Sequence, residues 1–174
     1  MIQRTITTVV NNTPGVLNRI TGLLSRRGFN IESITVGVTE NPKTSRMTFV
    51  VVVDSLRAID QVIKQLNKQV DVLKVRDITE ESIVARELAL IKISASPAQR
   101  AEIGALANTF RAQIIDVGHD NMTIEVTGDH QKVEALIDLL KPYGLLEIAR
   151  TGITALTRGT RKIGADASRV TFIN

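Results

Sequence analysis

Apolar residues along the chain follow two spacings, and their order predicts the fold. In some stretches every second residue is apolar, as in strands, and in others apolar residues recur every three or four positions, as in helices. The first half reads strand, helix, strand, strand, helix, strand. We place the strands at residues 2–10, 29–38, 47–53 and 70–78, one helix from Thr13 to about Arg27, and the other after a cap at Asp54–Ser55.

The second half repeats this order, with strands at 83–95, 114–117, 122–126 and 145–156. One helix follows Ser96-Pro97-Ala98-Gln99, which has the pattern of a capping box with proline at the first helical position, and the other follows Asp129. The later helix of each half carries apolar residues at the same spacing, shifted by 74 positions: Ile59, Val62, Ile63 and Leu66 against Val133, Leu136, Ile137 and Leu140.

The repeat predicts an α+β fold of two tandem ferredoxin-like βαββαβ domains, each an antiparallel sheet with helices on one face. We assign residues 1–78 to the first domain, 79–82 to a linker, 83–158 to the second domain and 159–174 to a basic tail. Because helices cover one face of each sheet, the other face and the edges stay available for contacts. We therefore expect dimerisation that extends or covers a sheet.

The junction between the first strand and the first helix is the strongest candidate for a binding site. Thr13 is the predicted N-cap, Pro14 suits the first helical position, and Gly15 lets another group approach the backbone. The backbone N–H groups of Gly15, Val16 and Leu17 would then face outward at the positive end of the helix dipole, where a carboxylate or phosphate binds favourably. The alternative is a capped turn with nothing bound, which is common in strand–helix junctions.

The composition and charge of the chain are those of a soluble globular protein. The chain is 43% hydrophobic and 23% charged and contains no cysteine, membrane-length apolar run or apolar signal core near its start. We expect a cytoplasmic protein with no membrane partner. The net charge is +4, but residues 158–174 hold +3 of it, and aromatic residues are few, so a nucleic-acid partner is not expected.

Residue patterns for catalysis or metal binding are missing. His119 and His130 have no partner at metal-ligand or triad spacing, and the sequence holds neither a phosphate-binding P-loop nor a dinucleotide-binding glycine pattern. We expect no catalytic residues and no metal site in this chain, which disfavours a stand-alone enzyme.

Seven runs of residues give the chain a specific resemblance. They are 12–17 (NTPGVL), 26–36 (RRGFNIESITV), 45–48 (SRMT), 65–68 (QLNK), 86–92 (RELALIK), 110–117 (FRAQIIDV) and 149–152 (ARTG). Together they resemble the small regulatory subunit of acetohydroxyacid synthase, also called acetolactate synthase, and the likeness extends to about Arg158. The Pro-Gly turn alone is shared by many amino-acid-sensing ACT domains, whereas residues 26–33 are specific.

The resemblance implies an N-terminal ACT domain, a second ferredoxin-like domain and no catalysis or cofactor in this chain. It implies a homodimer formed through the ACT domain that binds a separate catalytic large subunit, raises its activity and confers feedback inhibition by a branched-chain amino acid, usually valine. That partner would carry thiamine diphosphate, Mg²⁺ and FAD, and would condense pyruvate with a second 2-ketoacid in the synthesis of valine, leucine and isoleucine.

The resemblance also places the valine site between two protomers. One protomer would supply Asn12, Gly15, Val16 and Leu17, and the other Asn30 and Ile31. Backbone N–H groups at 15–17 would take the carboxylate, both asparagines would bind the charged ends, and Leu17 and Ile31 would line the pocket for the isopropyl group. Two other interpretations stay open: an ACT-type sensor of another amino acid, and a nucleic-acid-binding regulator, which would bind in a salt-dependent way.

Overall fold

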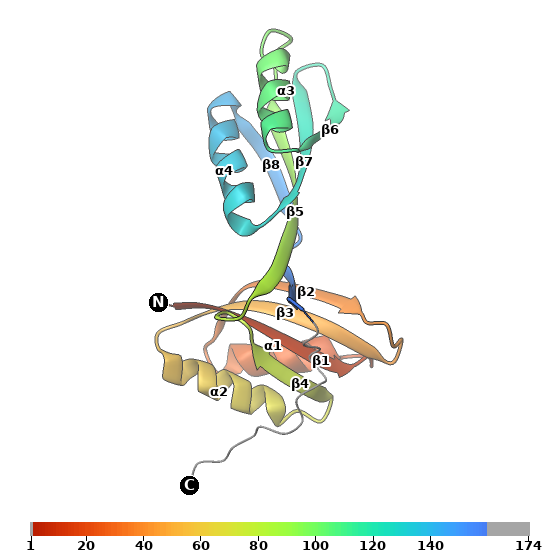
Figure 1. Ribbon diagram of the computed structural model, residues 1–174, viewed down its shortest axis with the longest axis vertical. Helices are drawn as coiled ribbons and strands as arrows, with labels where there is room; N and C mark the ends of the chain where they lie inside the picture. Colours follow the sequence, from red (N-terminus) through yellow and green to blue (C-terminus); the bar gives the residue numbers. More distant parts are fainter. Residues whose placement is uncertain (1, 160–174) are drawn as a thin grey trace. The chain divides into compact units, whose positions relative to one another are not determined.

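A computed structural model describes residues 2–159 of the 174-residue chain and shows two compact units (Figure 1). Residues 2–84 and 155–159 form the first unit, and residues 85–154 form the second. The basic tail predicted for 159–174 lies outside the described residues, apart from Gly159.

The first unit is a four-stranded antiparallel sheet with two helices on one face (Figure 1). Its elements are β1 (Ile2–Asn11), α1 (Val16–Arg26), β2 (Asn30–Val38), β3 (Thr44–Val53), α2 (Leu56–Asn67) and β4 (Val72–Asp77). The strand order β2-β3-β1-β4 leaves β2 and β4 at the edges. Side chains alternate across the strands, so that Ile6, Met47 and Phe49 pack against the helices. The predicted ferredoxin-like arrangement is confirmed here.

The two helices of this unit begin or end at residues whose chemistry suits a helix cap. Of the two residues predicted to cap α2, Asp54 and Ser55, it is Ser55 whose side chain accepts a hydrogen bond from the Ala58 N–H. At the end of α1, Gly28 has a φ of 73°, and the N–H groups of Gly28 and Phe29 donate to the carbonyls of Ser25 and Leu24. This is a Schellman cap, which needs a residue that tolerates positive φ.

The second unit has the same strand order, β6-β7-β5-β8, and the same placement of its helices. Its elements are β5 (Ile83–Ser94), α3 (Arg100–Thr109), β6 (Gln113–Val117), β7 (Asn121–Gly128), α4 (His130–Leu140), a 3₁₀ turn (Lys141–Tyr143) and β8 (Leu145–Arg150). The side chain of Asp129 accepts from the Lys132 N–H and caps α4 as predicted. Ile91, Ile124 and Leu136 are fully buried between the sheet and the helices.

Two of the predicted helix starts are wrong. We placed Thr13 at the cap and Pro14 in the first helical position, but α1 begins at Val16 and its N-cap is Gly15. We placed Pro97 in the first helical position, but α3 begins at Arg100; the Gln99 side chain does accept from the Ser96 N–H over 3.1 Å, as the predicted capping box requires. In both places the proline belongs to a turn that precedes the helix, because proline fits the second position of a turn as well as the first turn of a helix.

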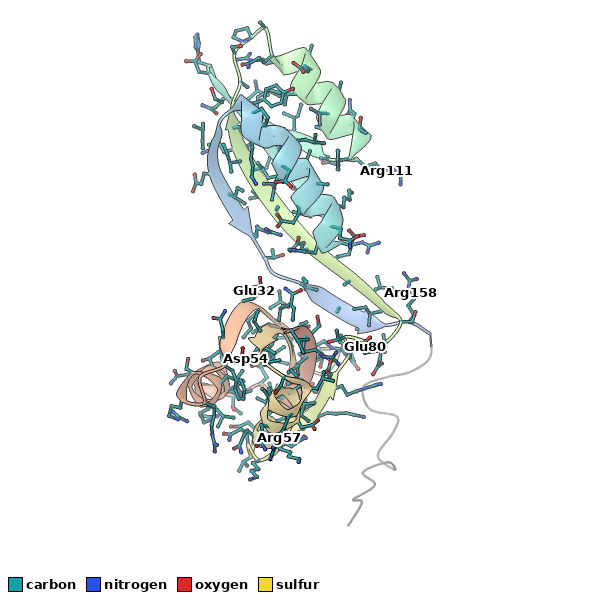
Figure 2. The ribbon with its side chains drawn as sticks, turned by 90° about the vertical axis from the view of Figure 1, so that its left-hand side faces the viewer. Glu32, Asp54, Arg57, Glu80, Arg111 and Arg158 are labelled. Atoms are coloured by element: carbon teal, nitrogen blue, oxygen red, sulfur yellow. The ribbon has the colours of Figure 1, made fainter. Side chains whose placement is uncertain are left out.

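The last predicted strand, 145–156, is also wrong as a single element. The structure breaks it after Arg150, at Gly152 with a φ of 75°, and a separate strand β9 (Thr154–Thr157) pairs with β5. Just beyond β9, the backbone N–H of Arg158 donates to the Ser82 carbonyl over 2.8 Å, and its side chain donates to the Ile83 carbonyl over 3.1 Å (Figure 2). After β8 the chain therefore returns to the start of β5, at residues 82–83.

Candidate functional site

The junction between β1 and α1 is a tight turn rather than a first helical turn. Gly15 has φ 79° and ψ −1°, the values of the third residue of a type II turn, in which proline commonly precedes glycine. The N–H of Val16 donates to the Thr13 carbonyl over 3.3 Å and closes the turn. Glycine is needed because a positive φ strains other residues.

This turn leaves several backbone donors at the start of α1 without acceptors. The first bond of the helix joins the Arg19 N–H to the Gly15 carbonyl, at 3.0 Å. Within residues 2–159, the N–H groups of Gly15, Leu17 and Asn18 meet no hydrogen-bond acceptor. The N–H of Val16, predicted to be free, is used by the turn. Asn18, which the sequence analysis did not include, takes its place in the set of free donors.

Asn12 is fixed to the loop that joins β2 to β3. Its backbone N–H donates to the Lys43 carbonyl over 2.8 Å, and its side-chain Nδ2 donates to the Pro42 carbonyl over 3.0 Å. The residue is exposed, and with Nδ2 engaged its side-chain oxygen is the group left to accept a donor. Asn12 therefore keeps a side-chain acceptor three positions before Gly15 in the sequence.

Apolar positions near the turn divide into core and surface. Val16 is buried in the core of the first unit, whereas Leu17 is 42% exposed. Ile31 is half-buried and packs against the same core, and Asn30 is exposed at the start of β2. The side chain of Leu17 is thus available to a ligand, while that of Val16 is not.

One chain does not bring the two predicted halves of the site together. Asn11, at the end of β1, lies opposite Thr44 of β3, while Asn30, at the start of β2, lies opposite Val52. Thr44 and Val52 are eight positions apart on β3, which corresponds to about 26 Å along an extended strand. Asn30 and Ile31 therefore lie at the far end of the sheet from the turn of their own chain.

A charged group in the second unit was missed by the sequence analysis. The Glu87 side chain is only 4% exposed, and its Oε1 lies 2.7 Å from Nη2 of Arg150, whose Nη1 contacts Glu134. The Nδ1 atom of His130 lies 3.4 Å from the same Glu87 oxygen. Because every member faces an opposite charge or a hydrogen-bonding partner, we assign this group to holding β5, β8 and α4 together.

The described residues form neither a metal-binding cluster nor a membrane-spanning helix. Across residues 2–159, no three histidine, aspartate or glutamate side chains are placed to hold a metal ion. None of the helices described is long and apolar enough to cross a membrane.

Comparison with protein-family models assigns both units. Residues 6–74 match the model described as the AHAS small subunit-like ACT domain, and residues 86–159 match the model of the small subunit of acetolactate synthase. Residues 75–85 separate the two matches, and the first match contains the β1–α1 turn.

Similar proteins agree with these matches. The acetolactate synthase small subunit of Bacillus subtilis is 54% identical over 99% of this chain and all of that protein, and that of Mycolicibacterium smegmatis is 47% identical over 92% of this chain and 94% of its own length. A crystal structure of the acetolactate synthase small subunit from Thermotoga maritima superposes with a TM-score of 0.83, at 42% identity, covering 92% of this chain and all of that one. The chain therefore belongs to the family of acetolactate synthase small subunits, with an ACT-like domain at its N-terminus.

Proposed function

We propose that this chain is a non-catalytic regulatory subunit that activates a separate catalytic subunit of acetolactate synthase and makes it sensitive to valine. The observation that carries the proposal is the set of free N–H groups at the start of α1, inside the domain that matches the ACT model of this family. The catalytic subunit would hold thiamine diphosphate, Mg²⁺ and FAD and would perform the condensation of 2-ketoacids.

A dimer would complete the effector site. Strand β2 is an edge strand, and its Val36 and Val38 side chains are 47% and 61% exposed. If the β2 strands of two copies pair antiparallel, the start of one strand lies beside the end of the other. The end of β2 leads into the loop that Asn12 contacts, so Asn30 and Ile31 of the second copy would reach the same end of the sheet as the turn.

Each group in this assembled site has a role that suits its chemistry. The N–H groups of Gly15 and Leu17 would bind the carboxylate of valine, with that of Asn18 beside them. The Asn12 oxygen would accept from the ammonium group, and Asn30 of the second copy would hydrogen-bond the charged end from the other side. Leu17 and Ile31 would contact the isopropyl group.

Magnitudes are consistent with a sensor of a free metabolite. A carboxylate at a helix N-terminus contributes about 0.3–1 kcal/mol, up to ~2 when partly buried. Burial of a valine-sized side chain adds about 1.5–3 kcal/mol, and hydrogen bonds to its charged ends add roughly 1.5–3 kcal/mol each, while association and ordering subtract from the sum. A net of roughly 4–8 kcal/mol corresponds to a Kd between about millimolar and micromolar. One methylene changes such a pocket by only ~1–3 kcal/mol, so leucine and isoleucine should bind too, with different affinity.

The test is calorimetric titration of the purified chain with L-valine, with leucine, isoleucine, serine and phenylalanine as comparisons. Asn12→Ala should lose saturable valine binding, and Asn67→Ala, at the exposed end of α2, serves as the matched control. The same proteins are then mixed with the catalytic subunit, and acetolactate formation is assayed with and without valine. Activation without any amino-acid effect would reject the sensing role and keep the role of a regulatory subunit.

A further inference from the structure

An ion pair between Arg19 and Asp71 lies beside the β1–α1 turn at the surface of the first unit. Arg19, on the first turn of α1, places Nε and Nη2 at 2.9 and 2.6 Å from Oδ2 of Asp71. Asp71 directly precedes β4 and is far from Arg19 in the sequence. The Arg19 side chain is 48% exposed and that of Asp71 22%, so the pair lies at the surface and is not part of the core.

Both members of this pair also contact the turn itself. The Asp71 carbonyl accepts from the Asn11 N–H over 2.8 Å, and the Thr13 hydroxyl lies 3.4 Å from the other Asp71 carboxylate oxygen. The third guanidinium nitrogen of Arg19, Nη1, lies 3.4 Å from the Pro14 carbonyl. The two residues therefore hold the turn from its β1 side and from its helix side.

The Arg19–Asp71 pair lies next to the free backbone donors. A Cβ atom placed on Gly15 would come within 3.1 Å of Nη1 of Arg19. Arg19 thus limits the space beside Gly15 while its other two nitrogens stay on Asp71. The orientation of the N–H groups of Gly15, Leu17 and Asn18 depends on the backbone that this pair restrains.

From these contacts we propose that Arg19 and Asp71 are positioning residues for the effector site, which order the turn before the ligand arrives. The proposal rests on the proposed function, because it concerns the same site. Ordering a flexible loop on binding lowers affinity, and a loop that is already ordered avoids this loss. In this scheme the pair binds no ligand atom, and its effect passes through the geometry of residues 13–18.

The test uses four variants of the full chain: Arg19→Ala, Asp71→Ala, the double variant, and the exchanged pair Arg19→Asp with Asp71→Arg. Valine affinity is measured by calorimetry, and the half-inhibitory valine concentration is measured after mixing with the catalytic subunit. We expect each single variant to raise both the Kd for valine and the half-inhibitory valine concentration about tenfold, which corresponds to about 1.4 kcal/mol of lost loop ordering. The double variant should be no worse than either single one, since all three lose the same contact.

The exchanged pair separates positioning from general damage, because it should recover most of the lost affinity. The exposed ion pair between Lys141 and Asp138, at 2.6 Å in the second unit, is the matched control. Lys141→Ala and Asp138→Ala should leave valine affinity unchanged. High salt should weaken valine binding more in the unsubstituted chain than in the double variant, since salt screens a surface pair.

Three results would overturn the proposal. If Asp71→Ala tightens binding while Arg19→Ala weakens it, Arg19 contacts the ligand directly and Asp71 competes for it. If all four variants bind valine as the unsubstituted chain does, the pair has no part in the site, although the proposed function stands. If the unsubstituted chain neither binds a branched-chain amino acid nor confers inhibition, the proposed sensing role fails and this inference fails with it.

Discussion

Substitution of Gly15 by aspartate tests the proposed effector site most directly. Gly15 occupies the left-handed region, at φ 79°, and a Cβ at this position faces Nη1 of Arg19 at 3.1 Å. An aspartate here would carry its carboxylate into the space beside the free N–H groups of the turn. We expect Gly15→Asp to abolish inhibition by valine while the chain still folds and binds the catalytic subunit.

The expected magnitudes support both halves of this prediction. A non-glycine residue in the left-handed region costs about 1–2 kcal/mol, and aspartate is among the residues that tolerate it best. The new carboxylate regains about 0.3–1 kcal/mol at the positive end of the helix. The net loss is small beside a typical stability of about 5–15 kcal/mol, so the fold should survive.

Ligand binding should suffer far more than folding. Two carboxylates about 4 Å apart repel by about 4 kcal/mol at the effective dielectric constant of a protein surface. The ligand also loses its N–H partners, which are worth up to ~2 kcal/mol. Together these terms exceed the ~2.7 kcal/mol that corresponds to a hundredfold loss of affinity.

Calorimetry and acetolactate assays at increasing valine concentration provide the measurement. Gly15→Ala introduces the backbone strain without the charge and should lose less affinity than Gly15→Asp. Gly159→Asp is the matched control, since Gly159 also has a positive φ, 76°, and open space around its Cβ position. Unchanged valine inhibition in the Gly15→Asp protein would refute our placement of the carboxylate.

Three further predictions concern the second unit. Arg150→Ala should destabilise the fold by up to about 3–5 kcal/mol, because it leaves the buried Glu87 carboxylate with only the His130 imidazole beside it. Glu134→Ala should cost less than about 1 kcal/mol; urea unfolding compares the two variants, and equal losses would contradict the network. Ile124→Ala should cost about 2–5 kcal/mol because its side chain is fully buried, while Ile115→Ala, half-exposed on β6, should stay within about 0.5 kcal/mol in the same experiment. A hydrogen bond to Glu102, followed by desolvation, raises the pKa of the Tyr143 phenol above its ordinary value of 10.0. The neutral phenol is thus favoured in the folded state. Its contribution to folding stability is complete below pH ~10 and is lost as pH rises through the raised pKa. Tyr143 is the chain's single tyrosine, so an ultraviolet titration follows it alone, and a midpoint that Glu102→Ala does not lower would contradict the contact.

The elements themselves could be predicted because they follow from local spacing. Alternation and helical periodicity identified the strands and helices of both units, and Ser55 and Asp129 were correctly predicted as caps. The errors fell at Pro14 and Pro97, where proline fits either a turn or a helix start. At Pro14 the following glycine carried the decisive signal, because a Pro-Gly pair fits a type II turn, in which the glycine has a positive φ and is not itself helical.

Sequence periodicity could not predict which charged residues pair with each other. Arg19 and Asp71 are 52 positions apart, and Arg150 and Glu87 are 63 apart. Which residues face each other also depends on strand register, and the register of β4 against β1 shifts at Val9/Val10. Periodicity is unchanged by such a shift in pairing, so it cannot reveal which charge meets which.

Sequence periodicity is even less able to show how the two halves of the proposed effector site come together. The turn and the start of β2 lie at opposite ends of one sheet, so no argument from a single chain brings them together. What joins them in our proposal is the free edge of β2, which exists because β3, and not β2, lies next to β1 in the strand order. A sensor built this way has a ligand that contacts two copies at once, so valine should strengthen the dimer by the same factor by which dimerisation strengthens valine binding. Sedimentation of the purified chain over a dilution series, with and without valine, measures that factor, and a dimer constant that valine leaves unchanged would exclude a shared site.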